Sequence, residues 1–308
     1  MDPQFTVLTT TSSFNYEGIP ANIRLVKNPH KRRLKETELN ELISRHRPDG
    51  IISGVEPMTR DILESAKGLK VISRCGTDLD SIDLKAAKNL GISVYTTRTA
   101  PDQPLAELTV TLILSLLKQI RQMDSSVRNG KWSRSITGLL AEKTVGVLGC
   151  GMRGTKVARL LEPFGCQLMG CDAHVRRHEF LDMVEFDRII AHSDIITLHA
   201  PMTSKNYHLI GREEIAGMKD GVLIVNTARA GLIDEAALYE GLKSGKVGGA
   251  GLDVFEEEPY LGPLNEFPGN VILTPHIGAF AGNYRYDMEK EALENMIKGL
   301  QRTHSVKV

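Results

Sequence analysis

A glycine-rich turn in the middle of the chain constrains the fold more than any other feature of the sequence. In the segment TVGVLGCGMRG an apolar run leads into three glycines, and a helical pattern follows over 155–161. In a turn of this kind Gly149 allows the tight bend, Gly151 lets a ligand approach the backbone, and Gly154 lets helix and strand pack closely. This strand–turn–helix context predicts a dinucleotide-binding βαβ unit. The pyrophosphate is expected at the N-terminus of the helix that begins near Met152.

An acidic residue, Asp172, follows the predicted second strand of this unit, 18 residues after Gly154. A carboxylate at this position accepts hydrogen bonds from ribose hydroxyls and repels a 2′-phosphate, so Asp172 favours NAD over NADP. Two alternatives stay open. Asp172 could cap the next turn, and Arg176 and Arg177 could moderate the preference for NAD.

Apolar runs that alternate with helical patterns predict an α/β fold made of two Rossmann-like domains with parallel sheets. A helix predicted at 285–300 follows the last strand and is expected to pack on the first domain, which makes that substrate domain discontinuous. The expected domains are residues 1–98 plus 280–308 for the substrate and 99–279 for NAD. Strands are predicted at 6–10, 50–53, 71–74, 93–96, 145–149, 167–171, 194–198, 222–226, 249–252 and 271–273.

The composition excludes several classes of partner. Lys plus Arg and Asp plus Glu balance at 38 each, so no net charge attracts the protein to nucleic acid or to an anionic membrane. The longest apolar stretch, 105–117, contains polar residues and is too short to span a bilayer. The cysteines show no C-x-x-C pair and no metal-ligand spacing. We therefore expect reduced thiols, no metal site and a cytoplasmic location.

Three segments place polar groups at the carboxyl ends of predicted strands, where open α/β sheets bind ligands. They contain Arg229, Glu258 and His276. Oxidation of a hydroxy acid needs a cation for the carboxylate and a base for the hydroxyl proton. Arg229 offers bidentate carboxylate geometry, a histidine exchanges protons near neutral pH, and Glu258 can fix the ring of His276. Taken singly, Arg229 could instead form a surface salt bridge and His276 could be a structural strand-end residue, but their order and spacing together favour catalysis.

The motifs NTARAGLIDE (226–235), LDVFEEEP (252–259) and TPHIG (274–278) carry a family resemblance. Through them, and over about 71–276, the chain resembles the D-2-isomer-specific 2-hydroxyacid dehydrogenases, in particular the phosphoglycerate dehydrogenase-like branch. The resemblance implies an NAD-dependent oxidoreductase that transfers a hydride between nicotinamide and C2 of a small D-2-hydroxy acid or 2-oxo acid.

The resemblance also implies roles for individual residues. Arg229 would bind the substrate carboxylate, His276 would be the acid/base with Glu258 as its partner, and Asp253 would hold the nicotinamide carboxamide. A homodimer is implied, with a small hydroxy or oxo acid as its ligand. The expected cofactor contacts are Thr77, Gly149, Gly151, Met152, Arg153, Gly154, Asp172, His199, Ala200, Pro201, Thr227, Ala228, Asp253 and Gly278.

The loop that the resemblance assigns to the substrate departs from the family pattern. Gly76, Thr77 and Asp78 stand there, and Asp78 replaces a glycine of the family. A carboxylate a few Å from an anionic substrate costs about 1 kcal/mol or more. Either the side chain turns away, or the substrate carries a donor that Asp78 recognises. Arg134, in the segment GKWSR, resembles an arginine that reaches a substrate phosphate across the dimer, so the substrate with or without phosphate stays open.

One alternative belongs to a different class of protein. The C-terminal-binding-protein corepressors share the fold and the Arg, Glu and His of the site, and they use NAD as a conformational sensor with little turnover. Reduction of any 2-oxo acid by this chain would separate the two functions.

Overall fold

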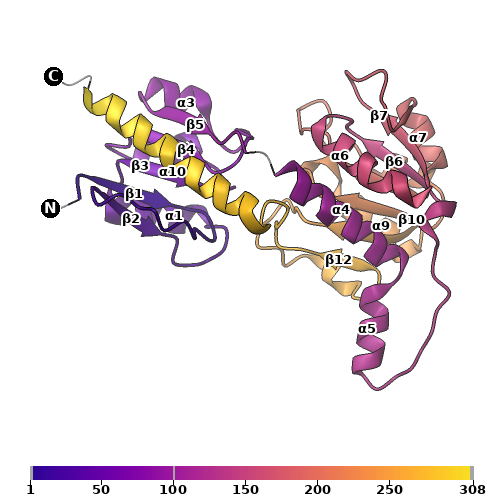
Figure 1. The fold of residues 1–308 in the computed structure, drawn as a ribbon. Coiled ribbons are helices and arrows are strands. Elements are labelled where there is room, and N and C mark those ends of the chain that lie inside the picture. The colour runs from indigo at the N-terminus through magenta and orange to yellow at the C-terminus, as the bar shows by residue number, and fades with distance from the viewer. Residues whose placement is uncertain (1–2, 100, 306–308) are drawn as a thin grey trace. The chain divides into compact units, whose positions relative to one another are not determined.

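Two separate parallel sheets organise the chain, and each belongs to its own structural unit (Figure 1). The computed structural model describes residues 3–99 and 101–305. Unit 1 consists of Met1–Pro101 and Phe280–Val308, and unit 2 consists of Asp102–Ala279. The prediction of an α/β fold with two parallel, Rossmann-like sheets is confirmed.

Unit 1 is built on a five-stranded sheet in the order β2-β1-β3-β4-β5, which is a doubly wound order. Helices α1 (Glu36–His46), α2 (Arg60–Ser65) and α3 (Leu84–Asn89) share one core with apolar residues of the strands such as Ile72. The strands are β1 (Phe5–Thr9), β2 (Ile23–Lys27), β3 (Gly50–Ser53), β4 (Val71–Arg74) and β5 (Ser93–Thr96).

The last helix, α10 (Gly282–Ser305), lies against β3, β4 and β5. Ser73 donates from Oγ to the backbone carbonyl of Ala292 at 2.7 Å. Because Ser73 and its neighbour Ile72 point to opposite faces of the sheet, α10 covers the face that α1–α3 leave open. The return of α10 makes unit 1 discontinuous, as the sequence predicts.

Unit 2 contains a seven-stranded sheet in the order β12-β11-β10-β9-β6-β7-β8. Numbered within the unit, this is the 3-2-1-4-5-6 order of dinucleotide-binding sheets with one strand added. The order reverses between β6 and β9, so the crevice at their carboxyl ends is the expected ligand site. The strands are β6 (Thr144–Leu148), β7 (Gln167–Cys171), β8 (Asp182–Met183), β9 (Ile195–Leu198), β10 (Val222–Asn226), β11 (Val247–Leu252) and β12 (Val271–Leu273).

Helices cover both faces of this sheet. Apolar residues of α4 (Asp102–Leu117) and α6 (Met152–Leu161) form one core, and those of α7 (Phe186–His192), α8 (Arg212–Gly217) and α9 (Glu235–Ser244) belong to the other. The glycines of β11 let α4 approach closely, since a Cβ built on Gly251 would lie 3.1 Å from Leu112 Cβ. Short 3₁₀ turns occur at Leu140–Glu142, Glu162–Phe164, Ala230–Leu232 and Pro263–Glu266.

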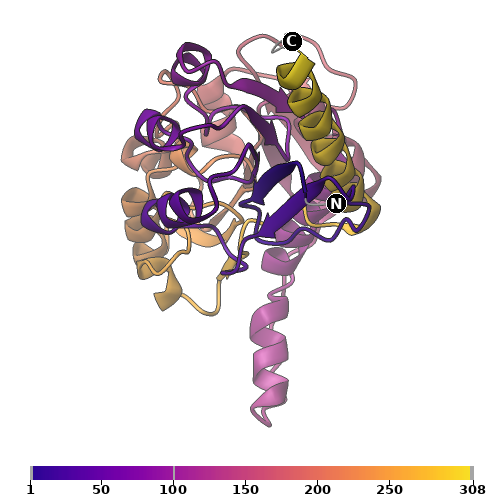
Figure 2. The same cartoon turned by 90° about the vertical axis from the view of Figure 1, so that its left-hand side faces the viewer.

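One helix of unit 2, α5 (Ile120–Arg128), projects away from the sheet and its covering helices (Figures 1 and 2). It buries none of its residues. We call residues 120–139, which comprise α5 and the loop that returns from it, the arm. Large apolar side chains are exposed along the arm at Ile120, Val127, Trp132, Ile136 and Leu139.

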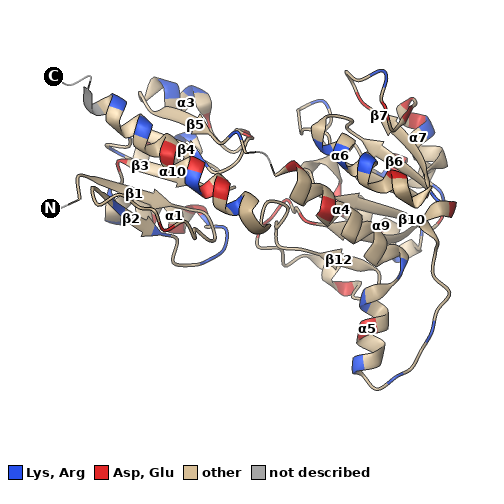
Figure 3. Ribbon diagram, in the orientation of Figure 1, with Lys and Arg blue, Asp and Glu red and all other residues tan. Residues whose placement is uncertain are grey.

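Acidic and basic residues are both present along α10 (Figure 3). This mixture agrees with the formal net charge of zero. Within the described residues, none of the helices has the length and apolar character needed to cross a membrane.

Candidate active site

The glycine-rich turn joins β6 to α6 and has the shape that a pyrophosphate requires. Gly149 has a φ of +94°, and a Cβ built on it would lie 2.3 Å from the backbone nitrogen of Ala200. A Cβ on Gly154 would lie 2.0 Å from the carbonyl oxygen of Gly149, whereas nothing lies within 4 Å of a Cβ on Gly151. The first N–H groups of α6, which starts at the exposed Met152, have no acceptor within their helix. Open space beside these donors fits the phosphates of a dinucleotide.

Asp172 follows β7 and accepts hydrogen bonds from three backbone N–H groups. Its Oδ1 accepts from His174 at 2.7 Å and Val175 at 3.0 Å, and its Oδ2 accepts from Cys150 at 2.8 Å. Burial raises the pKa of Asp172, but the three N–H groups outweigh it and bring the pKa below its ordinary value. The alternative that Asp172 caps the next turn is therefore realised, and the bond from Cys150 shows that it also holds the glycine-rich turn. A carboxylate oxygen can accept more than one hydrogen bond, so Oδ2 has the capacity to accept from a ribose hydroxyl as well.

Residues 199–201 follow β9 and border the turn. His199 is buried, and its backbone N–H donates to the carbonyl of Leu148 at 2.6 Å, while its Nε2 lies 2.9 Å from Thr197 Oγ1. Burial, with a smaller effect of the charge on Arg153, lowers the pKa of His199 to about 3, so its ring is neutral. Arg153 itself forms an ion pair with Asp102 at 3.4 Å. Of the remaining predicted residues here, Ala200 is half-buried and Pro201 is exposed.

The segment after β10 forms a tight turn around Arg229. Asn226 holds the turn, because its Oδ1 accepts from the Ala228 N–H at 3.0 Å and its Nδ2 donates to the Arg229 carbonyl at 2.8 Å. The Arg229 guanidinium donates from Nη1 to the Ala228 carbonyl at 2.8 Å. Thr227 is buried and shares a hydrogen bond of 2.8 Å with Thr109 of α4. The motifs do not assign this role to Asn226, although its place as the last residue of the buried strand β10 is a signal for it.

His276 and Glu258 are in contact, as the sequence predicts. Nδ1 of His276 lies 3.1 Å from Oε1 and 3.2 Å from Oε2 of Glu258. The Glu258 side chain is 10% exposed and that of His276 is 32% exposed, so the carboxylate is inside and the ring reaches outward. Glu258 Oε1 also accepts from the Phe255 N–H at 3.2 Å.

Asp253, which follows β11, holds the loop that carries His276. Its Oδ1 accepts from Thr274 Oγ1 at 2.6 Å and from the Ile277 N–H at 2.8 Å, and its Oδ2 accepts from the Gly278 N–H at 2.8 Å. Burial raises the pKa of Asp253, and these bonds and the neighbouring His276 oppose the rise. Because β10, β11 and β12 are neighbours in the sheet, Arg229, Asp253 and His276 all follow adjacent strand ends.

The predicted substrate residues other than Arg229 lie elsewhere in the chain. Gly76, Thr77 and Asp78 follow β4 of unit 1, where Thr77 Oγ1 is 3.5 Å from Asp78 Oδ1. A Cβ on Gly76 would lie 2.9 Å from Nη1 of the buried Arg74, so this loop rests directly on a guanidinium. Arg134 is exposed in the arm of unit 2.

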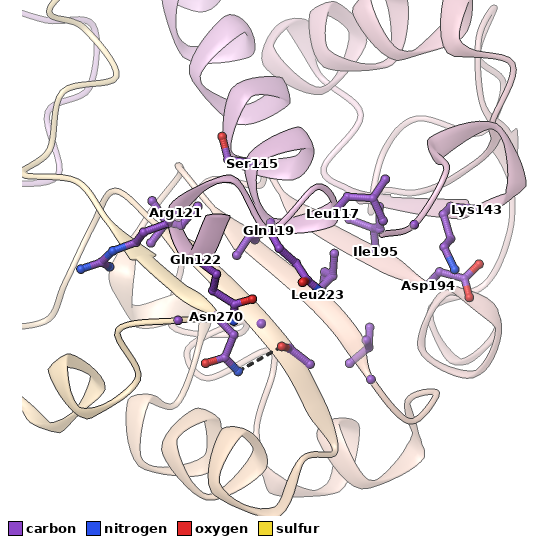
Figure 4. A pocket seen from close by; sticks show the side chains of 18 of the residues that line it. Ser115, Leu117, Gln119, Arg121, Gln122, Lys143, Asp194, Ile195, Leu223 and Asn270 are labelled. Carbon is purple, nitrogen blue, oxygen red and sulfur yellow. Dashed lines mark hydrogen bonds between the residues drawn. The ribbon is translucent and has the colours of Figure 1, made fainter. Parts of the chain in front are cut away.

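A cavity within unit 2 lies away from the predicted site. It has a volume of about 360 Å³ and is found at the amino ends of the strands, next to Lys143, Asp194 and Asn270 (Figure 4). Asn270 Nδ2 donates to the Gly248 carbonyl at 3.0 Å in its wall. None of the predicted site residues lines it, since they follow the carboxyl ends of the strands. Among the described residues, no group of three or more His, Cys, Asp or Glu could hold a metal ion.

Comparison with known proteins identifies the family. The model of the D-isomer specific 2-hydroxyacid dehydrogenase, NAD binding domain, matches residues 110–278. The chain is 40% identical over 259 residues to the hydroxypyruvate reductase of Thermotoga maritima, which covers 81% of this chain and 84% of that protein. A crystal structure of a glyoxylate reductase from Paecilomyes thermophila superposes with a TM-score of 0.79 and 30% identity, covering 98% of this chain and 97% of that one.

This chain therefore belongs to the D-isomer specific 2-hydroxyacid dehydrogenases, a family of NAD-dependent oxidoreductases. The prediction of the family and of NAD as cofactor is confirmed. The D-3-phosphoglycerate dehydrogenase of Methanocaldococcus jannaschii is 44% identical over 232 residues, which is 72% of this chain but only 44% of that protein. The chain thus spans less than half the length of this phosphoglycerate dehydrogenase relative.

Proposed function

We propose that this protein interconverts a small D-2-hydroxy acid and the corresponding 2-oxo acid, with bound NAD accepting or supplying the hydride at C2. The observation that carries the proposal is the His276–Glu258 pair. Glu258 follows β11 and His276 follows β12, in a unit whose glycine-rich turn has open space beside a helix N-terminus. Gly76, Thr77 and Asp78 of unit 1 are proposed as substrate residues, and unit 2 is proposed as the NAD unit.

His276 would move the proton. Because Nδ1 faces both oxygens of Glu258, the neutral ring carries its hydrogen on Nδ1. Nε2 is then the nitrogen that takes a proton from the C2 hydroxyl or returns one to the C2 carbonyl oxygen. The carboxylate of Glu258 stabilises the imidazolium formed when the hydroxyl loses its proton, and it keeps the ring in one orientation.

Arg229 would bind the substrate carboxylate. Its guanidinium can form two parallel hydrogen bonds with a carboxylate, which fixes the direction of the substrate as well as its position. The bonds that Asn226 makes across the turn hold the backbone from which Arg229 extends. Lysine would keep the charge without the paired bonds.

The test measures oxidation of NADH with glyoxylate, hydroxypyruvate, 3-phosphohydroxypyruvate and phenylpyruvate. His276→Ala should lower kcat by about 10²- to 10⁴-fold while NADH affinity stays unchanged. Arg229→Lys should raise KM and lower kcat together, because the paired bonds serve both the ground state and the transition state. His192→Ala, which removes an exposed histidine of the same unit, is the matched control. Near-full activity of His276→Ala would refute the proton route, and no activity on any oxo acid would favour an NAD-sensing corepressor.

Asp78 bears on the choice of substrate. We propose that the native substrate is larger or more functionalised than 3-phosphoglycerate and presents a hydroxyl or amino group to Asp78. A carboxylate in this loop repels an anionic substrate, and a hydroxyl or amino group of the substrate that donates to Asp78 would oppose that repulsion. Asp78→Gly should then gain efficiency on glyoxylate and lose it on the native substrate. Unchanged kinetics on all substrates would mean that Asp78 does not select the substrate.

A homodimer formed through the arm is proposed as the working assembly. Trp132 is 78% exposed and Ile136 fully exposed, while α5 buries no residue of its own, so the arm has apolar surface for a second copy of the chain. Arg134, in the same loop, would serve the partner's substrate. Sedimentation should give a dimer for the wild type and a monomer for the double variant Trp132→Ser, Ile136→Ser. A monomeric wild type would refute the proposal.

A cytoplasmic location is also proposed. All four cysteines are free thiols, and Cys75 and Cys150 are buried.

The relatives named above are a reductase of hydroxypyruvate, a reductase of glyoxylate and a dehydrogenase, which favours turnover over NAD sensing.

A further inference from the structure

The turn that carries Glu258 is held from outside by another carboxylate. Phe255 and Glu256 present consecutive backbone N–H groups, and each is accepted by a glutamate side chain. Phe255 donates to Glu258 Oε1 at 3.2 Å, and Glu256 donates to Glu235 Oε1 at 2.9 Å. Since Glu258 also faces His276 through both oxygens, its placement depends on a turn that Glu235 anchors.

Glu235 is well fixed for this purpose. It is the first residue of α9, and the preceding Asp234 caps that helix by accepting from the N–H groups of Ala236 at 2.9 Å and Ala237 at 3.1 Å. The helix start is therefore satisfied without Glu235, whose side chain reaches across to the turn after β11. An acidic residue in the first turn is favoured by the helix dipole.

The location is nevertheless costly for a carboxylate. Burial raises the pKa of Glu235, and the nearby carboxylates of Glu256 and Glu258 raise it further. Glu256 is itself engaged on its outer side, where its Oε1 accepts from Tyr207 OH at 3.0 Å and lies 3.1 Å from His208 Nε2. Those contacts hold the exposed side chain of Glu256, whereas Glu235 holds its backbone.

We propose that Glu235 is a positioning residue for the reaction. By accepting the Glu256 N–H it fixes the 255–258 turn so that both oxygens of Glu258 meet His276 Nδ1. The inference rests on the proposed function, because it assumes that Glu258 supports His276 in catalysis. Glu235 itself touches neither His276 nor the reacting atoms in this assignment.

The test compares Glu235→Ala, which removes the acceptor, with Glu235→Gln, whose amide oxygen still accepts but carries no charge. Glu257→Gln is the matched control, since Glu257 is exposed in the same turn. We expect Glu235→Ala to lower kcat by about tenfold or more with KM for NADH unchanged, and Glu235→Gln to retain kcat within about threefold. When Glu258→Gln is already present, adding Glu235→Ala should lower kcat by less than about a further twofold, because both changes then act on the same interaction.

Amide hydrogen exchange provides a readout that does not depend on turnover. The Glu256 amide should exchange about tenfold faster or more in Glu235→Ala than in the wild type, and at the wild-type rate in Glu235→Gln and Glu257→Gln. Thermal unfolding of each variant excludes global loss of structure, and Glu235→Gln keeps the test valid if the alanine variant does not fold.

Distinct outcomes refute the two proposals. A wild type that reduces no 2-oxo acid refutes the proposed function, and the exchange rates then still decide whether Glu235 anchors the turn. An active wild type with unaffected Glu235→Ala overturns the inference. Equal losses in Glu235→Ala and Glu235→Gln also overturn it, because they would assign the effect to charge. The inference is also overturned if Glu235→Ala lowers kcat as strongly in the Glu258→Gln variant as it does in the wild type.

Discussion

Experiment can separate the roles of two glycines of the turn, Gly151 and Gly154, because an added methyl group meets different surroundings at each. At Gly154 a Cβ would lie 2.0 Å from the carbonyl oxygen of Gly149, a backbone atom that cannot move without opening the turn. At Gly151 a Cβ meets nothing within 4 Å, and its φ of −71° suits any residue. Gly154→Ala should therefore damage the fold, and Gly151→Ala should chiefly damage cofactor binding.

The magnitudes follow from the geometry. The overlap at Gly154 requires a backbone shift, which puts the cost at the upper end of overpacking, about 3 kcal/mol. Gly154 lies inside α6, so alanine regains about 1 kcal/mol of helix propensity. The net loss of about 2 kcal/mol lowers Tm by about 4–8 °C for a unit of this size. Gly151 is the N-cap of α6, where alanine costs about 0.5–1 kcal/mol, or about 1–4 °C.

The assay pairs thermal unfolding of the apo protein with fluorescence titration of NADH. Gly151→Ala should lose at least about tenfold in NADH affinity, or about 1.4 kcal/mol, because the methyl group occupies the open space beside the helix N-terminus. Gly211→Ala is the control, since Gly211 is the N-cap of α8 in the same unit. It should lose comparable stability and keep NADH affinity. Wild-type NADH affinity in Gly151→Ala would refute the pyrophosphate site, and a wild-type Tm in Gly154→Ala would refute the packing argument.

Three further predictions concern single side chains. In fluorescence titrations the wild type should bind NADH at least about tenfold more tightly than NADPH. Asp172→Ala should lower the affinity for NADH more than the affinity for NADPH, and so reduce the difference between the two. Equal use of both cofactors by the wild type would contradict the assignment of Asp172. His199 is neutral in the fold with a pKa of about 3, so below pH 6.5 only the unfolded chain gains its proton. Stability should then fall by about 1.4 kcal/mol per pH unit toward pH 3, and urea unfolding of His199→Gln should show a flatter dependence; parallel curves for the two proteins would disprove a buried neutral His199. Glu289 is fully buried and accepts from Arg285 Nε and from the N–H groups of Asn15 and Tyr16. Glu289→Ala should cost about 3–5 kcal/mol in urea unfolding, and a loss under about 1 kcal/mol would mean that the pair is solvated.

Much of the fold follows from the sequence, because buried parallel strands are short apolar runs bounded by breakers. The strands at Gly50–Ser53, Val222–Asn226 and Val271–Leu273 coincide with the predicted ones. The pattern does not predict the edge strand Ile23–Lys27, since only Ile23 of its residues is buried and its sequence IRLVK has no continuous apolar run. Helix α5 is not predicted for a related reason, because none of its residues is buried and it therefore has no buried apolar face to set a pattern.

The site shows where sequence reasoning stops. Motifs identify side chains that can do chemistry, and on that basis the family resemblance proposes Glu258 as the partner of His276. The two side chains are in contact in the structure. Backbone donors carry no sequence signal, so neither the bond from Cys150 to Asp172 nor the bond from Glu256 to Glu235 can be predicted. Each bond joins two segments that are about twenty residues apart in the sequence. Each also holds a loop that contains one of the motifs, although the motif itself gives no sign of the bond.

Asp253 joins two of the motifs in the structure, because its carboxylate in the first motif holds the loop of the second. The resemblance assigns it to the nicotinamide carboxamide, yet both of its oxygens accept from the loop that carries His276. His276 has a φ of +55°, a left-handed conformation that costs a non-glycine residue about 1–3 kcal/mol. Three hydrogen bonds to one buried carboxylate, on both sides of His276 in the sequence, can offset that cost. Without Asp253 the loop would relax toward ordinary backbone angles, and the ring would turn away from Glu258. The LDVF and TPHIG motifs therefore belong together because the first supplies the carboxylate that keeps the histidine of the second in its strained and useful conformation.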